Sequence, residues 1–591
     1  MKSKTSFFNK GIFSNLTKRF WPLWAFYFIV MLLIMPVSLI TNVYNTSAEL
    51  VSDALACFCM MSTEGGTVTA FLLAIILAMA MFSFMYSRRT AGLISSLPVS
   101  REAVFASAYL AGLVPFVLIN LAIAAIMLLI AGGRVVFSAA LIWLGSITLQ
   151  FIGFYGIALF TAMITGNLLA LPILYVIFNF LAVSMEFIIR SMMSCLIFGF
   201  GDCNPQYGTP FSPAVWLFDE LSFNVSNIKA PEIAFCGWNI LIIFFIAGLV
   251  LTLIAFLLFK RRKMEHTGDV IAVEKLRGVF KYGVAVCAAL SFGILLYDMF
   301  SSENVALLYV FCLLGAFMGY FVAEMLIRRS LKVFSGSWKG FIILAAACII
   351  FLLSMQVDAF GIEKRIPEAD DIEIAVIDCG QYSVTLGKED YAALCQLHKS
   401  ILSHKDKHQN FDSETDYYDY VRISYHLKNG YELKREYPIN LSSCKEDGLM
   451  LEELLNKDYA VKDRTSLDIP VNSDTIGYSC LDYYDTESDE WCCIEFSRAE
   501  ALDFYENGIL PDIKAGAYGY ASFVPGSKYE KEWLPADFSM DVLRGNENND
   551  ICDSLYIDIN TDAVNTLNWI LEHCKLDLLK LSDGIDAPEH A

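Results

Sequence analysis

Residues Arg88–Leu113, RRTAGLISSLPVSREAVFASAYLAGL, place a short polar stretch between two long apolar segments. A membrane helix needs about 20 apolar residues, and the segment on each side is long enough for one. Pro98 breaks the helical pattern, and Ser100 is a good N-terminal cap for a helix that starts directly after it. The stretch therefore predicts a short helix, a turn at Pro98 and a new membrane helix from Ser100. We call residues 88–101 the elbow.

The composition separates a membrane part from a soluble part. Of 591 residues, 56% are hydrophobic and the mean hydropathy is +0.50, values typical of membrane proteins. Residues 360–591 hold 21 Lys and Arg against 47 Asp and Glu, whereas the rest of the chain holds 22 against 16. We therefore predict an acidic soluble domain at 361–591, long enough for its own core. Its charge would repel phosphate, so we expect no nucleic acid partner.

Apolar segments of sufficient length predict about nine transmembrane helices. They cover about residues 21–42, 67–87, 103–131, 137–164, 168–199, 238–259, 282–300, 304–327 and 340–358. We group them as a six-span domain at 21–259 and three additional spans at 282–358, joined by a linker at 260–281. The predicted fold class is thus an α-helical polytopic membrane domain followed by an α+β soluble domain.

The distribution of Lys and Arg predicts the orientation in the membrane. With the N-terminus in the cytoplasm, the inside segments carry 19 Lys and Arg, and the outside loops carry only Arg134 and Lys229. Nine spans then place the acidic domain outside the cell, and a miscount of one span would move it to the cytoplasm. Residues 1–20, with Phe8 and Ile12 on one face, predict an amphipathic helix on the membrane surface; a frayed basic tail is the alternative.

The elbow sequence also resembles a known family. The run Leu97-Pro98-Val99-Ser100-Arg101, followed by a helix with AYLAGL, is similar to the cytoplasmic elbow of permease subunits of type 2 ABC transporters. The amphipathic N-terminus, the first six spans and the apolar loop FGFGDCNPQYGTPFSPAVWLF resemble the same family. The chain from about Gly361 resembles the extra domain of a Gram-positive subgroup. The last three spans depart from the family's six-span plan.

This resemblance implies a transport function. It assigns Leu97, Pro98, Val99, Ser100 and Arg101 to contact with a separate ABC ATPase, whose ATP-driven closure the elbow would pass to the spans. It implies export across a bacterial cell membrane, a second permease subunit in a homo- or heterodimer, and ATP and Mg²⁺ on the partner. The chain itself has no G-x-x-x-x-G-K-[ST] sequence, so we expect no cofactor and no enzyme activity in it. Without the resemblance, an ordinary polar loop is the favoured reading of the elbow.

Charged residues inside predicted spans are candidate functional residues, because a charge in a membrane is costly. Glu186 and Arg190 lie four residues apart in the fifth span, and Glu324 and Arg328 do so in the eighth. Both pairs fall near a predicted membrane face. We therefore favour interfacial ion pairs over a substrate path.

Gln150, Gly153 and Gly156 follow one another at a spacing of three in the fourth span. Glycines so spaced allow two helices to approach closely, although single glycines are also common in transmembrane helices. We predict either a close helix contact on this face or ordinary transmembrane glycines.

The soluble domain alternates strand and helix patterns. DIEIAVID has the period of a strand, and Asn429-Gly430 marks the turn of a hairpin. The order strand pair, helix, hairpin, helix recurs, which predicts two similar subdomains. The domain holds eight of the 16 cysteines. They could form disulfides outside the cell or remain buried free thiols.

Two weak metal patterns occur in this domain. His404 and His408, downstream of His398, have the spacing that lets two ligands share a metal on a helix; we favour a solvated helix end. The acidic run Asp482–Glu490 could bind Ca²⁺, but we favour a solvated loop between strands.

Three function classes explain the sequence features to different degrees. A permease explains the number of spans and the elbow. A membrane-anchored sensor or binding protein, acting through its acidic domain, explains the size of that domain but needs only one or two spans. An intramembrane enzyme lacks support, because the spans contain no apparent nucleophile–base pair or metal cluster. We therefore favour the permease, with the sensor as the alternative.

Overall fold

The computed structural model describes most of the chain. The described residues are 7–46, 50–96, 98–226, 232–262, 270, 276–300, 304–380, 382–409, 418–440, 443–457, 459, 470–485, 490–519, 527, 533–543 and 551–579. The chain forms two compact units. One unit contains Met1–Met192 and Cys203–Leu353, and the other contains Met193–Asp202 and Ser354–Ala591.

Within the described residues of the first unit, nine helices are long and apolar enough to cross a membrane, as predicted. These helices are α2–α3 (Trp21–Tyr44), α5 (Glu64–Met81), α7 (Arg101–Ile130), α8 (Arg134–Ile164), α9 (Ala170–Leu196), α11 (Trp238–Arg261), α12 (Leu276–Met299), α13 (Val305–Arg328) and α14 (Phe334–Gln356). The protein is therefore a polytopic membrane protein. The first span bends at a π-helical turn, Leu33–Val37, because Pro36 lies inside it.

Four shorter elements extend the six-span part. The predicted N-terminal helix is confirmed as α1 (Lys10–Arg19), whose Leu16 is buried. Helix α4 (Leu50–Ser62) follows the first span. The apolar loop before α11 contains helix α10 (Pro213–Glu220), followed by a hairpin of β1 (Ser222–Ser226) and β2 (Glu232–Cys236). Neither α4 nor this hairpin was predicted, because α4 is too short to span a membrane and each strand of the hairpin has only five residues.

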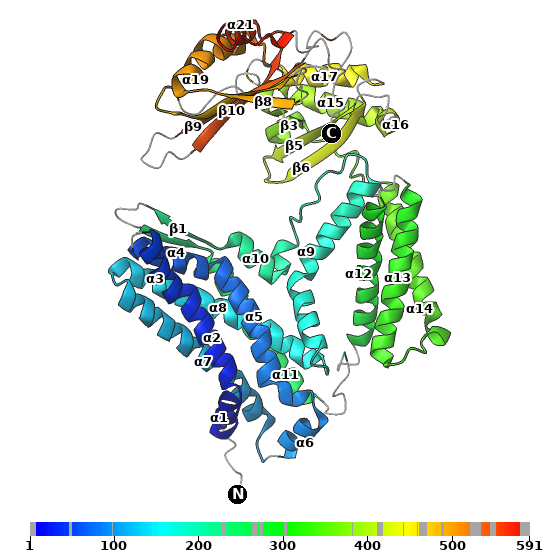
Figure 1. Cartoon of the computed structure of the whole chain (residues 1–591). Helices are drawn as coiled ribbons and strands as arrows, with labels where there is room; N and C mark the ends of the chain where they lie inside the picture. The colour runs from blue at the N-terminus through cyan, green and yellow to red at the C-terminus, as the bar shows by residue number, and fades with distance from the viewer. Residues whose placement is uncertain are drawn as a thin grey trace. The chain divides into compact units, whose positions relative to one another are not determined.

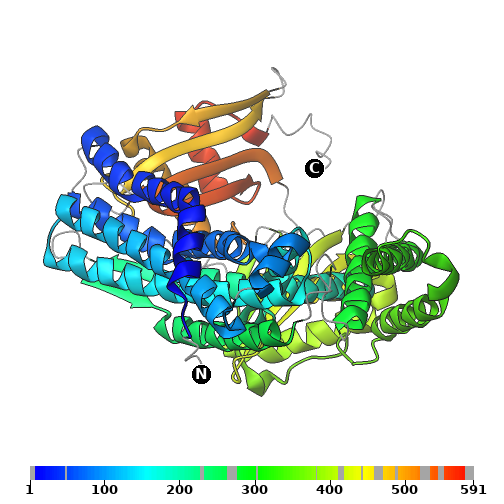
Figure 2. The ribbon, with the colours of Figure 1, turned by 90° about the horizontal axis from the view of Figure 1, so that it is seen from below.

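The described membrane helices pack around two large apolar cores and a small third cluster. The larger core joins residues from Leu16 to Phe259, and the smaller joins α12, α13 and α14 through residues such as Ala289, Tyr320 and Leu344. Figures 1 and 2 show α12, α13 and α14, in green, as a group of three adjacent helices. The six-plus-three grouping of the spans thus corresponds to the two larger cores. The small third cluster, around Ile164 and Leu174, includes Leu276 and Phe280 of α12 and so contacts both groups.

Helices α8 and α11 approach closely at glycines, which confirms the close-contact reading. A Cβ added to Gly156 would lie 2.2 Å from the carbonyl oxygen of Gly248, and one added to Gly153 would lie 2.2 Å from the ring of Phe244. The nearby Gln150 donates from Nε2 to the carbonyl of Ser62 at 2.9 Å, where α4 ends. Small residues here permit backbone-to-backbone packing that larger side chains would prevent.

The second unit contains two copies of one topology, which confirms the predicted repeat. The first copy runs β3 (Ile372–Cys379), β4 (Tyr382–Thr385), α15 (Tyr391–Ser403), α16 (Lys405–Gln409), β5 (Tyr418–Leu427), β6 (Glu432–Asn440) and α17 (Lys445–Leu455). The second runs β7 (Ile476–Asp485), β8 (Glu490–Glu495), α19 (Arg498–Phe504), α20 (Leu510–Ala515), β9 (Trp533–Leu543), β10 (Ile551–Asn560) and α21 (Val564–His573). The sheet orders β4-β3-β5-β6 and β10-β9-β7-β8 are the same order read from opposite ends.

Each sheet is antiparallel and buries one face under its helices. In the first copy, α15 and α17 cover the sheet, and Leu397, Leu451 and Ile423 meet in one core (Figure 1). Strand β6 alternates outward and buried residues, as a half-buried strand does. All fifteen described cysteines are free thiols, of which six are buried and two, Cys236 and Cys493, are exposed.

Residues 193–202 belong to the second unit, although the first four of them form the end of the fifth span, α9. Phe198 lies in the core of the first repeat, with its ring centroid 5.1 Å from that of Tyr437. The amide of Glu436, on edge strand β6, donates to the carbonyl of Gly199 at 3.2 Å. Gly199 has a φ of +77°, and a Cβ there would lie 1.9 Å from Tyr437. We call residues 193–202 the clasp, because they fasten the end of α9 to this sheet.

Candidate functional site at the elbow

The elbow has the predicted helix–turn–helix form. Helix α6 (Arg88–Ser96) ends before the turn, and α7 begins at Arg101. The side chain of Ser100 accepts a hydrogen bond from the amide of Ala103 at 3.2 Å, as an N-terminal cap does. Leu97, which the family resemblance assigns to the same turn, lies outside the described residues.

Arg101 fixes the start of α7 to the end of α11. Its Nη1 donates to the carbonyl of Lys260 at 2.9 Å and to that of Arg262 at 3.1 Å. The last carbonyls of a helix have no partner within the helix, so a guanidinium is well suited to cap them. The ammonium of Lys260 in turn lies 2.6 Å from the carboxylate of Glu102. Polar contacts from Arg101 and from Lys260 therefore join the start of α7 to the end of α11.

Arg262 extends the same arrangement to the end of α8. Its Nη1 donates to the carbonyls of Ala162 at 3.0 Å and Met163 at 3.3 Å. The hydroxyl of Tyr86, just before the elbow, also donates to the carbonyl of Ala162, at 3.1 Å. The elbow is thus connected through polar contacts to the ends of three spans. Sequence reasoning missed Glu102, Lys260 and Arg262, whose only signal was opposite charge at the ends of different spans.

The elbow presents a mixed apolar and charged surface. Leu93 is 64% exposed, and Arg89 and Pro98 are also exposed. Val99 is partly buried and packs against the large core instead. Of the predicted contact residues that are described, Pro98 and Arg101 are therefore outward, whereas Val99 and Ser100 hold the turn in place.

The predicted Glu186–Arg190 ion pair is present, with Nε 2.8 Å from Oε1. The same carboxylate accepts from the amides of Gln206 and Tyr207 at 2.9–3.1 Å, and also from that of Gly208. Glu186 therefore anchors the loop before α10. A carboxylate that receives so many donors has an evident structural role; its position at a membrane face stays a prediction.

The predicted Glu324–Arg328 pair is also present, at 2.6 Å. Glu324 is 6% exposed and has two further partners on other helices, Lys281 on α12 at 3.3 Å and Ser337 on α14 at 3.2 Å. Lys281 also donates to the hydroxyl of Tyr320 at 3.3 Å. Glu324 thus joins all three helices of the smaller core, a role that spacing along one helix could not reveal.

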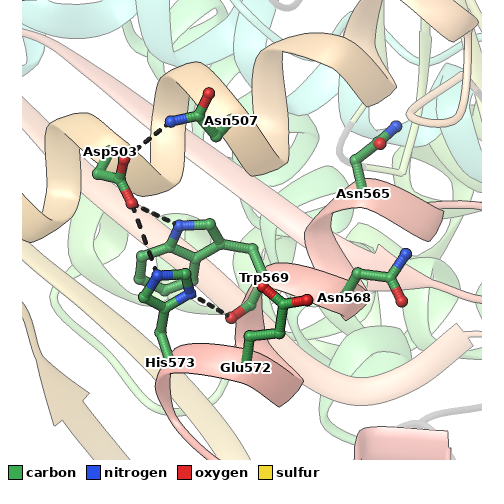
Figure 3. A pocket seen from close by; sticks show the side chains of 7 residues that line it. All are labelled: Asp503, Asn507, Asn565, Asn568, Trp569, Glu572 and His573. Carbon is green, nitrogen blue, oxygen red and sulfur yellow. Dashed lines mark hydrogen bonds and ion pairs between the residues drawn. The ribbon is translucent and has the colours of Figure 1, made fainter.

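The second repeat contains a polar hollow of about 320 Å³ beside α19 and α21. Figure 3 shows that its side chains mostly bond to one another. Asp503 accepts from Asn507 at 2.8 Å and from the indole nitrogen of Trp569 at 2.8 Å. Trp569 is only 7% exposed and stacks on His573, with ring centroids 4.3 Å apart. Trp569 therefore offers little open ring surface to a ligand, whereas half of the His573 side chain is exposed.

His398 and His408 are buried, although the sequence predicted a solvated helix end. His408 is fully buried and His398 is buried between Tyr425 and Tyr437, so the prediction of a solvated helix end is wrong for His408. The reason is that α16 packs against β6. Of the acidic run, Asp482–Asp485 belong to strand β7 and Glu490 begins strand β8, so the prediction of a loop is wrong for these residues, which extend the two strands. Residues 486–489 lie outside the described residues.

No family model, no curated protein and no solved structure matches this chain. Its class is therefore defined by its own architecture: a polytopic membrane protein with nine apolar membrane-length helices in the described residues, followed by a mixed α/β region with antiparallel sheets.

Proposed function

We propose that the protein is the permease subunit of an ATP-driven exporter, coupled to a separate ABC ATPase through the elbow. The observation that carries this proposal is the connection of Arg101 to the ends of α11 and, through Arg262, of α8. A push on the exposed elbow surface would move three spans together, because the contacts are short and in part charged. ATP and Mg²⁺ would bind the partner, and a second permease would complete the transporter.

The proposed orientation places the elbow in the cytoplasm and the repeat domain outside the cell of a bacterium. It rests on the excess of Lys and Arg in alternate loops. The repeat domain would then act as an outer gate, substrate receptor or partner dock. The clasp supports this, because it ties the domain to the end of the fifth span.

The test is affinity purification of the full chain from its native membranes. We expect a stoichiometric subunit with a G-x-x-x-x-G-K-[ST] motif to accompany it. Leu93→Asp should reduce its recovery at least about tenfold, because a charge would replace an exposed apolar contact of the kind that anchors interfaces. Leu331→Asp is the matched control, since Leu331 is 79% exposed in another connection between spans.

An equal loss in both variants would show that the elbow is not the specific contact. Failure to recover any such subunit, in several detergents and with ATP analogues, would favour the alternative function. In that alternative, the protein is a membrane-anchored sensor that acts through its repeat domain.

A further inference from the structure

Four side chains with metal-binding atoms gather in the first repeat of the second unit. One ring nitrogen of His404, one of His408, the sulfur of Cys444 and a carboxylate oxygen of Asp447 all lie within 4.8 Å of one another. They come from two places in the chain, the end of α15 with α16, and the start of α17. Nitrogen, sulfur and carboxylate donors in one cluster are the set that Zn²⁺ prefers.

The backbone holds these groups in place. His404 and His408 are four residues apart, and the amide of His408 donates to the carbonyl of His404 at 3.2 Å. Cys444 and Asp447 are three residues apart, and the amide of Asp447 donates to the carbonyl of Cys444 at 3.1 Å. Cys444 also precedes the first residue of the 11-residue helix α17. Burial and the charge of Asp447 raise the pKa of the Cys444 thiol, so a metal must displace its proton on binding.

One oxygen of Asp447 has no partner in the structure. The carboxylate is fully buried, and its Oδ2 lies 2.9 Å from both His404 Nδ1 and His408 Nε2. Its Oδ1 is buried without a hydrogen bond, although Ser400 is near enough to influence the carboxylate. Leaving a charged oxygen buried and unsatisfied is costly, so an absent positive partner would explain the arrangement.

The tautomer of His408 separates its role from that of the other three residues. Its Nδ1 lies 3.1 Å from the amide nitrogen of Asn440, which donates to it. The proton of the neutral ring is therefore on Nε2 and is donated to Asp447 Oδ2. A protonated nitrogen cannot bind a metal, so His408 orients the carboxylate instead, as residues beside metal ligands commonly do.

We propose that His404, Cys444 and Asp447 form a Zn²⁺ site, with His408 as the positioning residue for Asp447. His404 binds through Nδ1 and keeps its proton on Nε2, Cys444 binds as the thiolate after releasing its proton to solvent, and Asp447 binds through an oxygen. His404 is the access side, since 28% of its side chain is exposed. Water takes the fourth position, as three protein ligands permit.

A second cluster, Cys480, Asp482 and Cys493, provides a control rather than a competing site. The thiol of Cys480 already donates to Asp482 at 3.4 Å, and Cys493 is exposed on strand β8. Cys493→Ser therefore removes a thiol of the same domain without touching the proposed site.

The test is the zinc content and affinity of the full-length protein in detergent, after treatment with a chelator and titration with Zn²⁺ alone. We expect one tight site per chain, measured by elemental analysis and by competition with a chromogenic chelator. Asp447→Asn, Cys444→Ser and His404→Gln should each abolish it, and His408→Gln should weaken it about 10–100-fold. Cys493→Ser should bind as the parent protein does.

Co²⁺ substitution supplies a readout that folding alone would not change. The parent protein should show a thiolate-to-cobalt charge-transfer band, which His408→Gln retains and Cys444→Ser loses. Because His404 lies partly exposed at a helix end, His404→Gln serves as the variant expected to remain folded, checked by gel filtration and circular dichroism. Absence of a tight site in the parent, or binding that His404→Gln and Asp447→Asn leave unchanged, would overturn the proposal.

Discussion

At the residue scale, the second unit contains buried polar side chains that hydrogen-bond to one another. His398 lies between two tyrosine hydroxyls, 3.0 Å from that of Tyr425 and 2.7 Å from that of Tyr437. Burial, together with the positive charge of Arg435, lowers its pKa from 6.5 to about 3. The folded protein therefore excludes a proton that the unfolded chain binds.

This predicts a pH-dependent stability of the first repeat. The contribution of His398 is fully present above pH 6.5, the unfolded pKa, and is lost as the pH falls toward the folded value of about 3. The free energy of unfolding should fall by about 1.4 kcal/mol per pH unit in this window. Hydrogen exchange of β5 and β6 measures this pH dependence of the unfolding free energy. The rates are corrected for intrinsic exchange and measured above the pH range in which carboxylates titrate.

His398→Gln should flatten this slope, because glutamine does not titrate. His426→Gln is the control, since 45% of the side chain of His426 is exposed. A slope that both variants leave unchanged would assign the effect to other groups.

At the element scale, helix packing in the membrane part depends on where a glycine has a close neighbour. Gly156 faces the backbone of Gly248, whereas a Cβ added to Gly283 of α12 meets no atom within 4 Å. Both residues lie in helices, so the same substitution tests packing at one site and backbone propensity at the other.

Gly156→Ala should destabilise the protein by about 1–3 kcal/mol, because the added methyl group forces α8 and α11 apart. Gly283→Ala should be neutral or stabilise it by up to about 1 kcal/mol, because alanine favours a helix. Thermal unfolding in one detergent compares the two variants. Equal effects would mean that the α8–α11 approach is not tight at Gly156.

At the scale of the whole molecule, the second unit is built from two separate parts of the chain. The clasp reaches it from the fifth span, and the main part follows the ninth. The amide of Glu436 on edge strand β6 donates to the carbonyl of Gly199, so the clasp covers part of this sheet edge.

Cutting the chain between Phe360 and Gly361 at an inserted protease site should therefore leave the two fragments associated in detergent. Gly199→Val should release the C-terminal fragment, because a side chain there would collide with Tyr437. Gly430→Val is the matched control: its φ of +78° imposes the same backbone strain, but no atom lies within 4 Å of an added Cβ. Retention in the Gly199 variant would show that other contacts hold the fragments together.

The sequence by itself determined the class of fold. Apolar length marked the spans and alternation marked the strands, because both signals are local and repeat along the chain. It also located the turn at Pro98, the cap at Ser100 and the helical pairs of Glu186 and Glu324, whose partners lie one turn away.

Only the tertiary structure brought together residues that are far apart in sequence. Arg101 meets the end of α11 some 160 positions later, and Asp447 meets His404 and His408 across a turn and two strands. Such contacts leave no period in the sequence, because they depend on how whole elements pack. The clasp is the same case: Gly199 meets Glu436 and Tyr437 more than 230 positions later, and the sequence does not show which residues such a glycine will contact.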